Sequence, residues 1–407
     1  MKKLFKNLVW PIYFIIFFAV QNLTNWWALS VSGIRGGNFI DLGAVLRWSD
    51  CFKMEGTLVY GPEDGKCGGY LYGSALLRVF SFLGIRENQT QFWGLFGGLV
   101  SAVCLGLLAN IFISTERISK LFVVLVLSSP GIWLLVERGN IDELIFVLIL
   151  LSTFLFIRGF EIPAILIIAI TALFKFYTVP LLLLLVIVAR RNRSQLLALA
   201  SLFLVVPLVA VDYFRIKASF PSTWFVSFGS PAIGFWVNLF GEKFGQDWIH
   251  LSAISGHILG LALLIFSIFA VNKFAYVEKQ LEFPPNKSNN GGNMDAILLI
   301  FGSVFVLCYV LGMNYDYRLI FAAVSGIALI VRSSTRGYVG LIKGSLFLGL
   351  WLSSFTFGLQ NTPNIETITS FVLIQFVGDI ALGIFTAFLS LQLIKLVAQS
   401  FTSRTRV

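Results

Sequence analysis

The chain has 407 residues, of which 57% are hydrophobic and 12% are charged, and its mean hydropathy is +0.86. This composition excludes a water-soluble globular domain and indicates a membrane protein with many helices, because each spanning helix needs about 20 apolar residues. The formal net charge of +10 does not require a nucleic-acid partner, because basic cytoplasmic loops lie beside anionic lipids.

Apolar segments along the chain predict an all-α polytopic bundle of about twelve transmembrane helices. Lys and Arg favour cytoplasmic loops, and their distribution predicts that both termini are cytoplasmic. We expect the membrane to be the plasma (inner) membrane. The predicted spans are residues 8–30, 91–113, 121–136, 141–157, 162–174, 177–189, 196–213, 250–272, 295–313, 319–331, 339–357 and 368–394.

Two of these regions are predicted to be broken. Ser129-Pro130-Gly131 interrupts the span at 121–136. A single helix over 162–189 would hold Lys175 at mid-membrane and would reverse the sidedness of everything after it. The charge pattern therefore favours two short helices with Lys175 at the outer turn between them.

The loops suggest a division of the chain. Residues 1–272 are predicted to form a catalytic module with outer loops at 31–90 and 214–249, and 295–407 to form further helices. Residues 273–294, which include PPNKSNNGGNM, are predicted to be a flexible cytoplasmic linker. The loop at 214–249 is rich in Phe and Trp, which fits either an aromatic belt in the membrane interface or a groove for a lipid substrate.

The cysteines and histidines give little sign of metal chemistry. Cys51 and Cys67 share the first outer loop, where they are either a disulfide, in an oxidising compartment, or two free thiols. The two histidines lie far from any cysteine pair, so zinc-type ligand spacing is absent. We expect neither a metal nor a cofactor.

Polar residues gather in four segments that the topology brings to the outer face. They come from the first outer loop and from the segments VERGNIDELI, LFKFYTVP and GMNYDYRLI. Such convergence predicts an active site near the membrane interface. The candidates are Asp41, Asp50, Tyr60, Arg138, Asn140, Lys175, Tyr177, Tyr315, Asp316, Tyr317 and Arg318.

The order of these motifs resembles the family 87 glycosyltransferases, which have the GT-C fold and use polyprenyl-phosphate mannose. The resemblance covers most of residues 30–330 and rests on NFIDLGAVLRW, GTLVYG, YLYG, ERGNID, ALFKFYTVPLLLLL and NYDYRL. It implies an extracytoplasmic transferase that passes a sugar, mannose in that family, to a lipid-linked or glycan acceptor. The chain departs from the family pattern in LVYGPEDGKCGGYLYG, where a proline-containing segment similar to YPP is usual, and this leaves the acceptor open.

The same resemblance implies roles for individual residues. An Asp early in the first outer loop is the general base in that fold; Asp41 occupies this place, with Asp50 as the rival. Chemistry independently requires a base for the acceptor's proton and cations for the leaving phosphate. Lys175, Arg318 and Arg138 are the candidate cations. One base without a paired nucleophile predicts inversion at the anomeric carbon.

Structural alternatives accompany these assignments. Lys175 can reach lipid headgroups, and Arg318 can pair with Asp316. Asn140 fits a helix cap, and we expect Asp142 and Glu143 to serve that helix start, whereas Asp41 is predicted to lie in a loop.

The rival function is a transporter or flippase of a lipid-linked glycan. Such a protein should show internal repeats and ionisable groups along the membrane depth. This chain has no clear repeat and essentially one deep carboxylate, Asp379, for which a structural partner within the bundle is the favoured explanation.

Overall fold

The computed structural model describes most of the chain and shows it to be helical. Within the described residues, the one exception is a two-residue antiparallel pair, in which β1 (Ser227–Phe228) lies beside β2 (Asn314–Tyr315). The described residues are 2–24, 38–55, 72–115, 117–217, 227–228, 237, 253–277, 291–311, 314–315, 318–333, 336–353 and 365–404.

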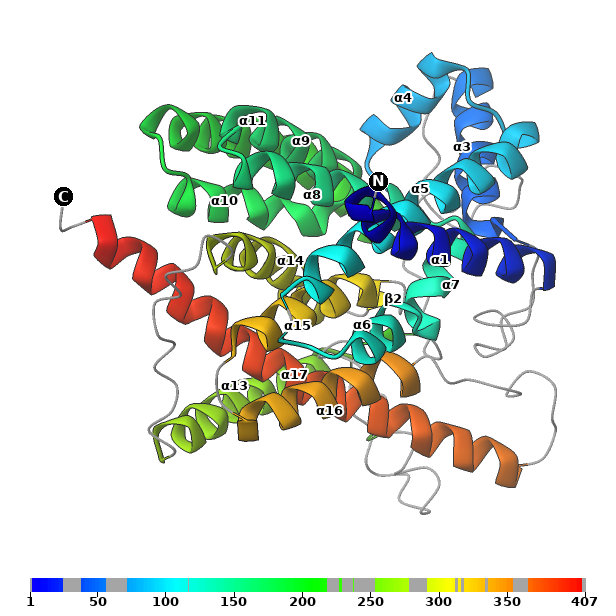
Figure 1. Ribbon diagram of the computed structural model, residues 1–407. Coiled ribbons are helices and arrows are strands. Elements are labelled where there is room, and N and C mark those ends of the chain that lie inside the picture. The colour runs from blue at the N-terminus through cyan, green and yellow to red at the C-terminus, as the bar shows by residue number, and fades with distance from the viewer. Residues whose placement is uncertain are drawn as a thin grey trace.

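The first helix packs against the first long helix after the outer loop. These are α1 (Lys2–Thr24) and α5 (Thr90–Ile113). Between them in the chain lie α3 (Ile40–Glu55), α4 (Ser74–Leu83) and the 3-10 turn η1 (Glu87–Gln89), seen at the upper right of Figure 1. The prediction that Asp41 lies in a loop is therefore wrong, because Asp41 is in the first turn of α3. The helix has a weak apolar pattern, and its N-terminal turn favours an acidic residue.

The predicted break in the third span is confirmed. The chain forms α6 (Lys120–Leu127) and α7 (Pro130–Arg138), which meet at an angle of 43°. Pro130 starts α7, where its missing N–H costs nothing because the first helical N–H groups have no partner within the helix.

The predicted hairpin around Lys175 is also confirmed. After α8 (Ile141–Ile157) come α9 (Glu161–Phe174), the 3-10 turn η2 (Phe176–Thr178), α10 (Val179–Val188) and α11 (Asn192–Lys217). Lys175 has extended backbone angles, φ −143° and ψ 121°, which end α9. This group of helices lies at the upper left of Figure 1.

The C-terminal part supplies the central helix of the bundle. It consists of α13 (Ala253–Val277), α14 (Gly291–Leu311), α15 (Leu319–Arg332), α16 (Arg336–Leu352) and α17 (Ile365–Arg404). Every residue of α15 from Leu319 to Val331 is buried, and α15 packs against α14, α16 and α5 to α7. α15 lies in the middle of the molecule (Figure 1), and Arg318 directly precedes it in the chain.

The boundaries of the predicted linker need correction. α13 continues to Val277 and α14 begins at Gly291, so both ends of the segment 273–294 are helical. Residues 278–290 lie outside the described part. Charged Lys273 ends the apolar window but does not end the helix, since Lys is a good helix former.

The apolar helices are those of a helical membrane protein. Five described helices are long and apolar enough to cross a membrane, or six if the bent pair α6 and α7 is one span. A helix lies at each of the twelve predicted ranges, although several are shorter than a typical span. Large apolar side chains on α11 and α13 point outward, with Phe203 71% and Phe266 71% exposed, as lipid contact requires.

Candidate functional site

Asp41 and Arg138 form the first half of a polar network at one end of the helical bundle. Both carboxylate oxygens of Asp41 accept hydrogen bonds from the guanidinium of Arg138, with Nε at 3.0 Å from each and Nη2 close to Oδ1. Asn140 Nδ2 donates to Asp41 Oδ2 at 2.7 Å. Three donor groups therefore make four hydrogen bonds to the Asp41 carboxylate, two at each oxygen, while its side chain stays 13% exposed.

The segment ERGNID places these side chains by its local structure. Gly139 adopts a left-handed conformation, φ 60° and ψ 39°, and ends α7. Asn140 then caps α8, as predicted, because its Oδ1 accepts the Asp142 N–H at 3.0 Å. A Gly stop followed at once by an Asn cap turns Arg138, Asn140 and Asp142 toward the same place.

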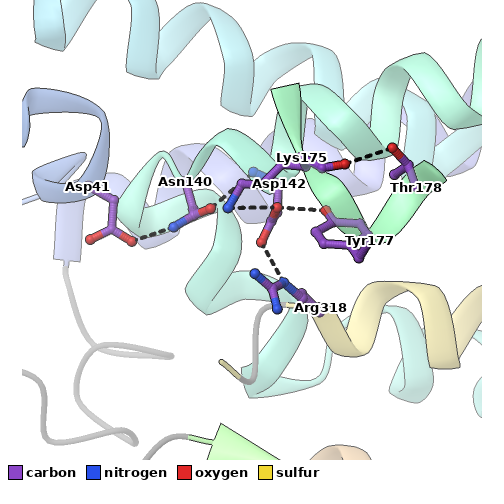
Figure 2. A network of polar contacts seen from close by, with 7 residues as sticks. All are labelled: Asp41, Asn140, Asp142, Lys175, Tyr177, Thr178 and Arg318. Atoms are coloured by element: carbon purple, nitrogen blue, oxygen red, sulfur yellow. Dashed lines mark hydrogen bonds and ion pairs between the residues drawn. The ribbon is translucent and has the colours of Figure 1, made fainter. Parts of the chain in front are cut away.

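Asp142 is the centre of the second half of the network, and its side chain is fully buried. Its oxygens meet Lys175 Nζ at 3.3 Å and Arg318 Nε at 3.1 Å, and Tyr177 donates its hydroxyl to Oδ1 at 2.6 Å. Figure 2 shows the arrangement, with Asn140 lying between the two carboxylates. A buried carboxylate needs such partners, because an unpaired buried charge is very costly.

Aromatic rings hold the two cations in place. Lys175 Nζ lies 3.9 Å from the centre of the Tyr72 ring, and the guanidinium carbon of Arg318 lies 4.7 Å from the centre of the Tyr177 ring. Burial lowers the pKa of Lys175, which lies in the turn outside the spanning helices, to about 8; the Asp142 carboxylate acts in the opposite direction. Lys175 is 8% exposed and turns inward, away from the lipid headgroups that it could otherwise reach.

Phe39 fixes the position of Asp41 from the other side. It has φ 63°, a conformation that is uncommon for a bulky residue, and its N–H donates to the Glu137 carbonyl at 2.7 Å. Its side chain is fully buried. The start of α3 is thus fastened to the end of α7, and strain of this kind is often found where function demands a fixed geometry.

Asp50 lies apart from this network. It follows Asp41 by about two and a half helical turns at 3.6 residues per turn, which places it on the opposite face of α3. There its Oδ2 accepts the Glu87 N–H at 3.0 Å, beside an ion pair between Arg47 and Glu87. Its contacts are those of a residue that holds the loop in shape.

Several other predicted residues can be placed only in part. Cys51 is disulfide-bonded, but Cys67 lies outside the described residues, so their pairing stays a prediction. Tyr60, Asp316 and Tyr317 also lie outside them, and only the backbone of Tyr315 is described. β2, which contains Tyr315, pairs Ser227 with Tyr315 and Phe228 with Asn314, and so joins the aromatic second outer loop to the segment that carries Arg318.

Reasoning from the sequence missed two members of the network. Asp142 was expected only to serve the start of α8, and Tyr72 was not singled out within YLYG. The signal for Asp142 was that the predicted topology places its segment at the same face as the segments of Lys175 and Arg318, although it does not say which side chains meet. Tyr72 had no such signal, because its contact with Lys175 depends on how the first outer loop folds back.

The network carries three cations and two carboxylates, and therefore a formal charge of +1. A net positive, largely buried site whose ion pairs are already formed is suited to an anionic ligand such as a phosphate. Among the residues that the structure describes, no group of three His, Cys, Asp or Glu side chains could hold a metal ion. Asp379 lies on α17 near Tyr309, outside the network.

No protein-family model, curated protein or solved structure matches this chain.

Proposed function

We propose that this membrane protein is a glycosyltransferase that moves a sugar, mannose by resemblance, from a polyprenyl phosphate to a lipid-linked or glycan acceptor. The observation that supports this most strongly is the joined pair of subsites in the network. One holds a carboxylate, Asp41, whose side chain is 13% exposed, and the other holds two cations, Lys175 and Arg318. Asn140 connects them.

The two subsites match the two demands of glycosyl transfer. The acceptor oxygen attacks the anomeric carbon while its proton passes to Asp41. The bond from that carbon to the phosphate oxygen breaks, and its electron pair leaves with the phosphate. Lys175 and Arg318 stabilise the negative charge that develops on this leaving group. A single displacement of this kind inverts the configuration at the anomeric carbon.

Arg138 is better suited to orienting Asp41 than to binding the phosphate. Its guanidinium holds both oxygens of that carboxylate, a geometry that fixes the plane of the acid. Arg318 can serve the phosphate while it binds Asp142, since a guanidinium has five N–H donors and Asp142 Oδ2 accepts from Nε.

The proposal includes a GT-C architecture with about twelve spans. The network lies where α7, α9 and α14 end and where α8, α10 and α15 begin, so it belongs to one face of the bundle. The excess of Lys and Arg in the opposite loops supports the proposal that this is the extracytoplasmic face.

The test is sugar transfer by the purified protein in nanodiscs, with radiolabelled polyprenyl-phosphate mannose and a lipid-extract pool of acceptors. We expect labelled product with the inverted anomeric configuration and release of polyprenyl phosphate. Movement of an intact labelled lipid-linked glycan across proteoliposomes, with no transfer from any polyprenyl-phosphate sugar tried, would instead indicate a flippase.

A further inference from the structure

Three consecutive residues of the first outer loop each contact a different part of the helical bundle. The Tyr72 ring lies over Lys175. The Gly73 N–H donates to the Phe174 carbonyl at 3.1 Å, and the Ser74 N–H donates to Asp212 Oδ2 on α11 at 2.7 Å. The loop is thus fastened to the ends of α9 and α11 at the point where Lys175 leaves α9.

This fastening requires glycine at position 73. A Cβ atom there would lie 1.9 Å from the Leu173 carbonyl oxygen, which is backbone and cannot turn aside. The close contact between the Gly73 backbone and the end of α9 brings Tyr72 to Lys175. Asp212 holds the next residue, Ser74, by accepting its N–H. Asp212 is 7% exposed, so its carboxylate acts within the packed structure.

Lys175 is held from two sides by this arrangement. Asp142 Oδ1 lies 3.3 Å from Nζ, and the Tyr72 ring covers the ammonium at 3.9 Å. Trp48 supports Tyr72 from α3, with the two ring centres 6.1 Å apart. A cation–π contact strengthens when water is excluded, so the ring both covers and aims a side chain that otherwise has many rotamers.

We propose that Asp212 is a positioning residue for the site: through Ser74 and Gly73 it holds the ring of Tyr72 over Lys175 and so directs the ammonium group. We name Asp212, Ser74 and Gly73 the loop latch. The positioning of the Lys175 ammonium group does not depend on the proposed function. Its contact with a phosphate does rest on that proposed function.

The first readout is the titration of Lys175 measured without any transfer reaction. Competitive acetylation with acetic anhydride across pH 6.5 to 10.5, followed by mass spectrometry, reports the fraction of neutral Lys175. In Asp212→Ala we expect the apparent pKa of Lys175 to move up by about one pH unit, because water reaches the uncovered ammonium. Three described charged groups act on Lys175, namely Asp142, Arg318 and Asp41, and all three are unchanged in this variant.

Two variants control for general loss of packing. Glu161 is another buried carboxylate that accepts backbone N–H groups, those of Arg190 and Arg191, at the far end of α9. Glu161→Ala should therefore leave the titration of Lys175 as in the wild type. Asp212→Asn should keep the titration of Lys175 close to that of the wild type, because the amide oxygen still accepts the Ser74 N–H.

The second readout is protection of Lys175 from acetylation by polyprenyl phosphate in nanodiscs. A shifted titration in Asp212→Ala together with weaker protection supports both the latch and the phosphate role. A shifted titration with no protection in any variant supports the latch and contradicts the proposed function. A titration in Asp212→Ala equal to that of the wild type overturns the latch.

If Asp212→Ala does not fold, Tyr72→Leu tests the same step. It removes the ring but leaves the latch in place, and Tyr72→Phe keeps the ring. The proposal requires the Leu variant to shift the titration of Lys175 and the Phe variant to leave it nearly unchanged; equal titrations in the two variants overturn it.

Discussion

At the scale of single residues, Asp142 decides whether the network can exist. Its fully buried carboxylate compensates Lys175 and Arg318 at once and accepts the hydroxyl of Tyr177. Without that carboxylate, two cations would remain in a site from which water is largely excluded. Its role is therefore to stabilise the charged forms of Lys175 and Arg318 in the site before any substrate binds.

Replacing Asp142 with Asn should destabilise the protein by about 3–5 kcal/mol, the usual cost of leaving buried charges uncompensated. The measurement is thermal unfolding of the purified variant in detergent. Adding Lys175→Met to Asp142→Asn should recover part of the loss, since one uncompensated charge is removed with it. An unchanged unfolding midpoint in Asp142→Asn would show that these ion pairs do not hold the site together.

The titration of Lys175 predicts how phosphate binding depends on pH. Its pKa is lowered to about 8, so the ammonium is charged below pH 8 and becomes neutral above it. Affinity for polyprenyl phosphate should therefore fall as pH rises through about 8. Lys175→Arg stays charged throughout this range, and its binding should lose this step. The same step in both proteins would assign the titration to another group.

At the scale of elements, the turn between α7 and α8 sets the spacing of the two subsites. Gly139 has φ 60° and separates Arg138, which holds Asp41, from Asn140, which joins Asp41 to the start of α8. The left-handed conformation lets the chain change direction with two residues, Gly139 and Asn140, between the two helices.

Gly139→Ala should cost about 1–2 kcal/mol, because a residue with a Cβ is disfavoured in this conformation. A Cβ would also lie only 3.2 Å from side-chain atoms of Leu42 and Phe39. Gly344→Ala on α16 is the matched control, since nothing lies within 4 Å of its added Cβ, and Ala favours a helix. Equal unfolding midpoints for the two variants would contradict the role of the turn.

The helices could be predicted far better than the network that they carry. Apolar length located the long helices, Pro130 marked the break, and the charge pattern separated α9 from α10 at Lys175. The cap at Asn140 also followed from local rules. The partners of Asp142 could not be predicted, because Lys175 and Arg318 reach it from distant segments through tertiary packing. The helix α3 was missed because its weak apolar pattern resembles that of a polar loop.

At the scale of the whole molecule, the site lies where several helices begin or end on one face of the bundle. α15, the most buried helix, brings Arg318 to it, and the first outer loop closes over it through Phe39 and the loop latch. Segments from both sides of the predicted linker therefore build one site.

The sidedness of this arrangement can be checked by thiol labelling. Met54 is 76% exposed near the end of α3, the helix whose first turn carries Asp41, whereas Ser114 is exposed at the end of α5. In right-side-out vesicles, an impermeant maleimide should label Met54→Cys and spare Ser114→Cys. Labelling of Ser114→Cys alone would place the network on the cytoplasmic side.

The central claim is that Asp41 accepts the acceptor's proton, and the most direct measurement is the rate of sugar transfer by Asp41→Asn and Asp50→Asn. We expect Asp41→Asn to lose about 10²- to 10⁴-fold in rate, the usual contribution of a general base, and Asp50→Asn to stay within about threefold of the wild type. Transfer by Asp41→Asn at the rate of the wild type would contradict the claim.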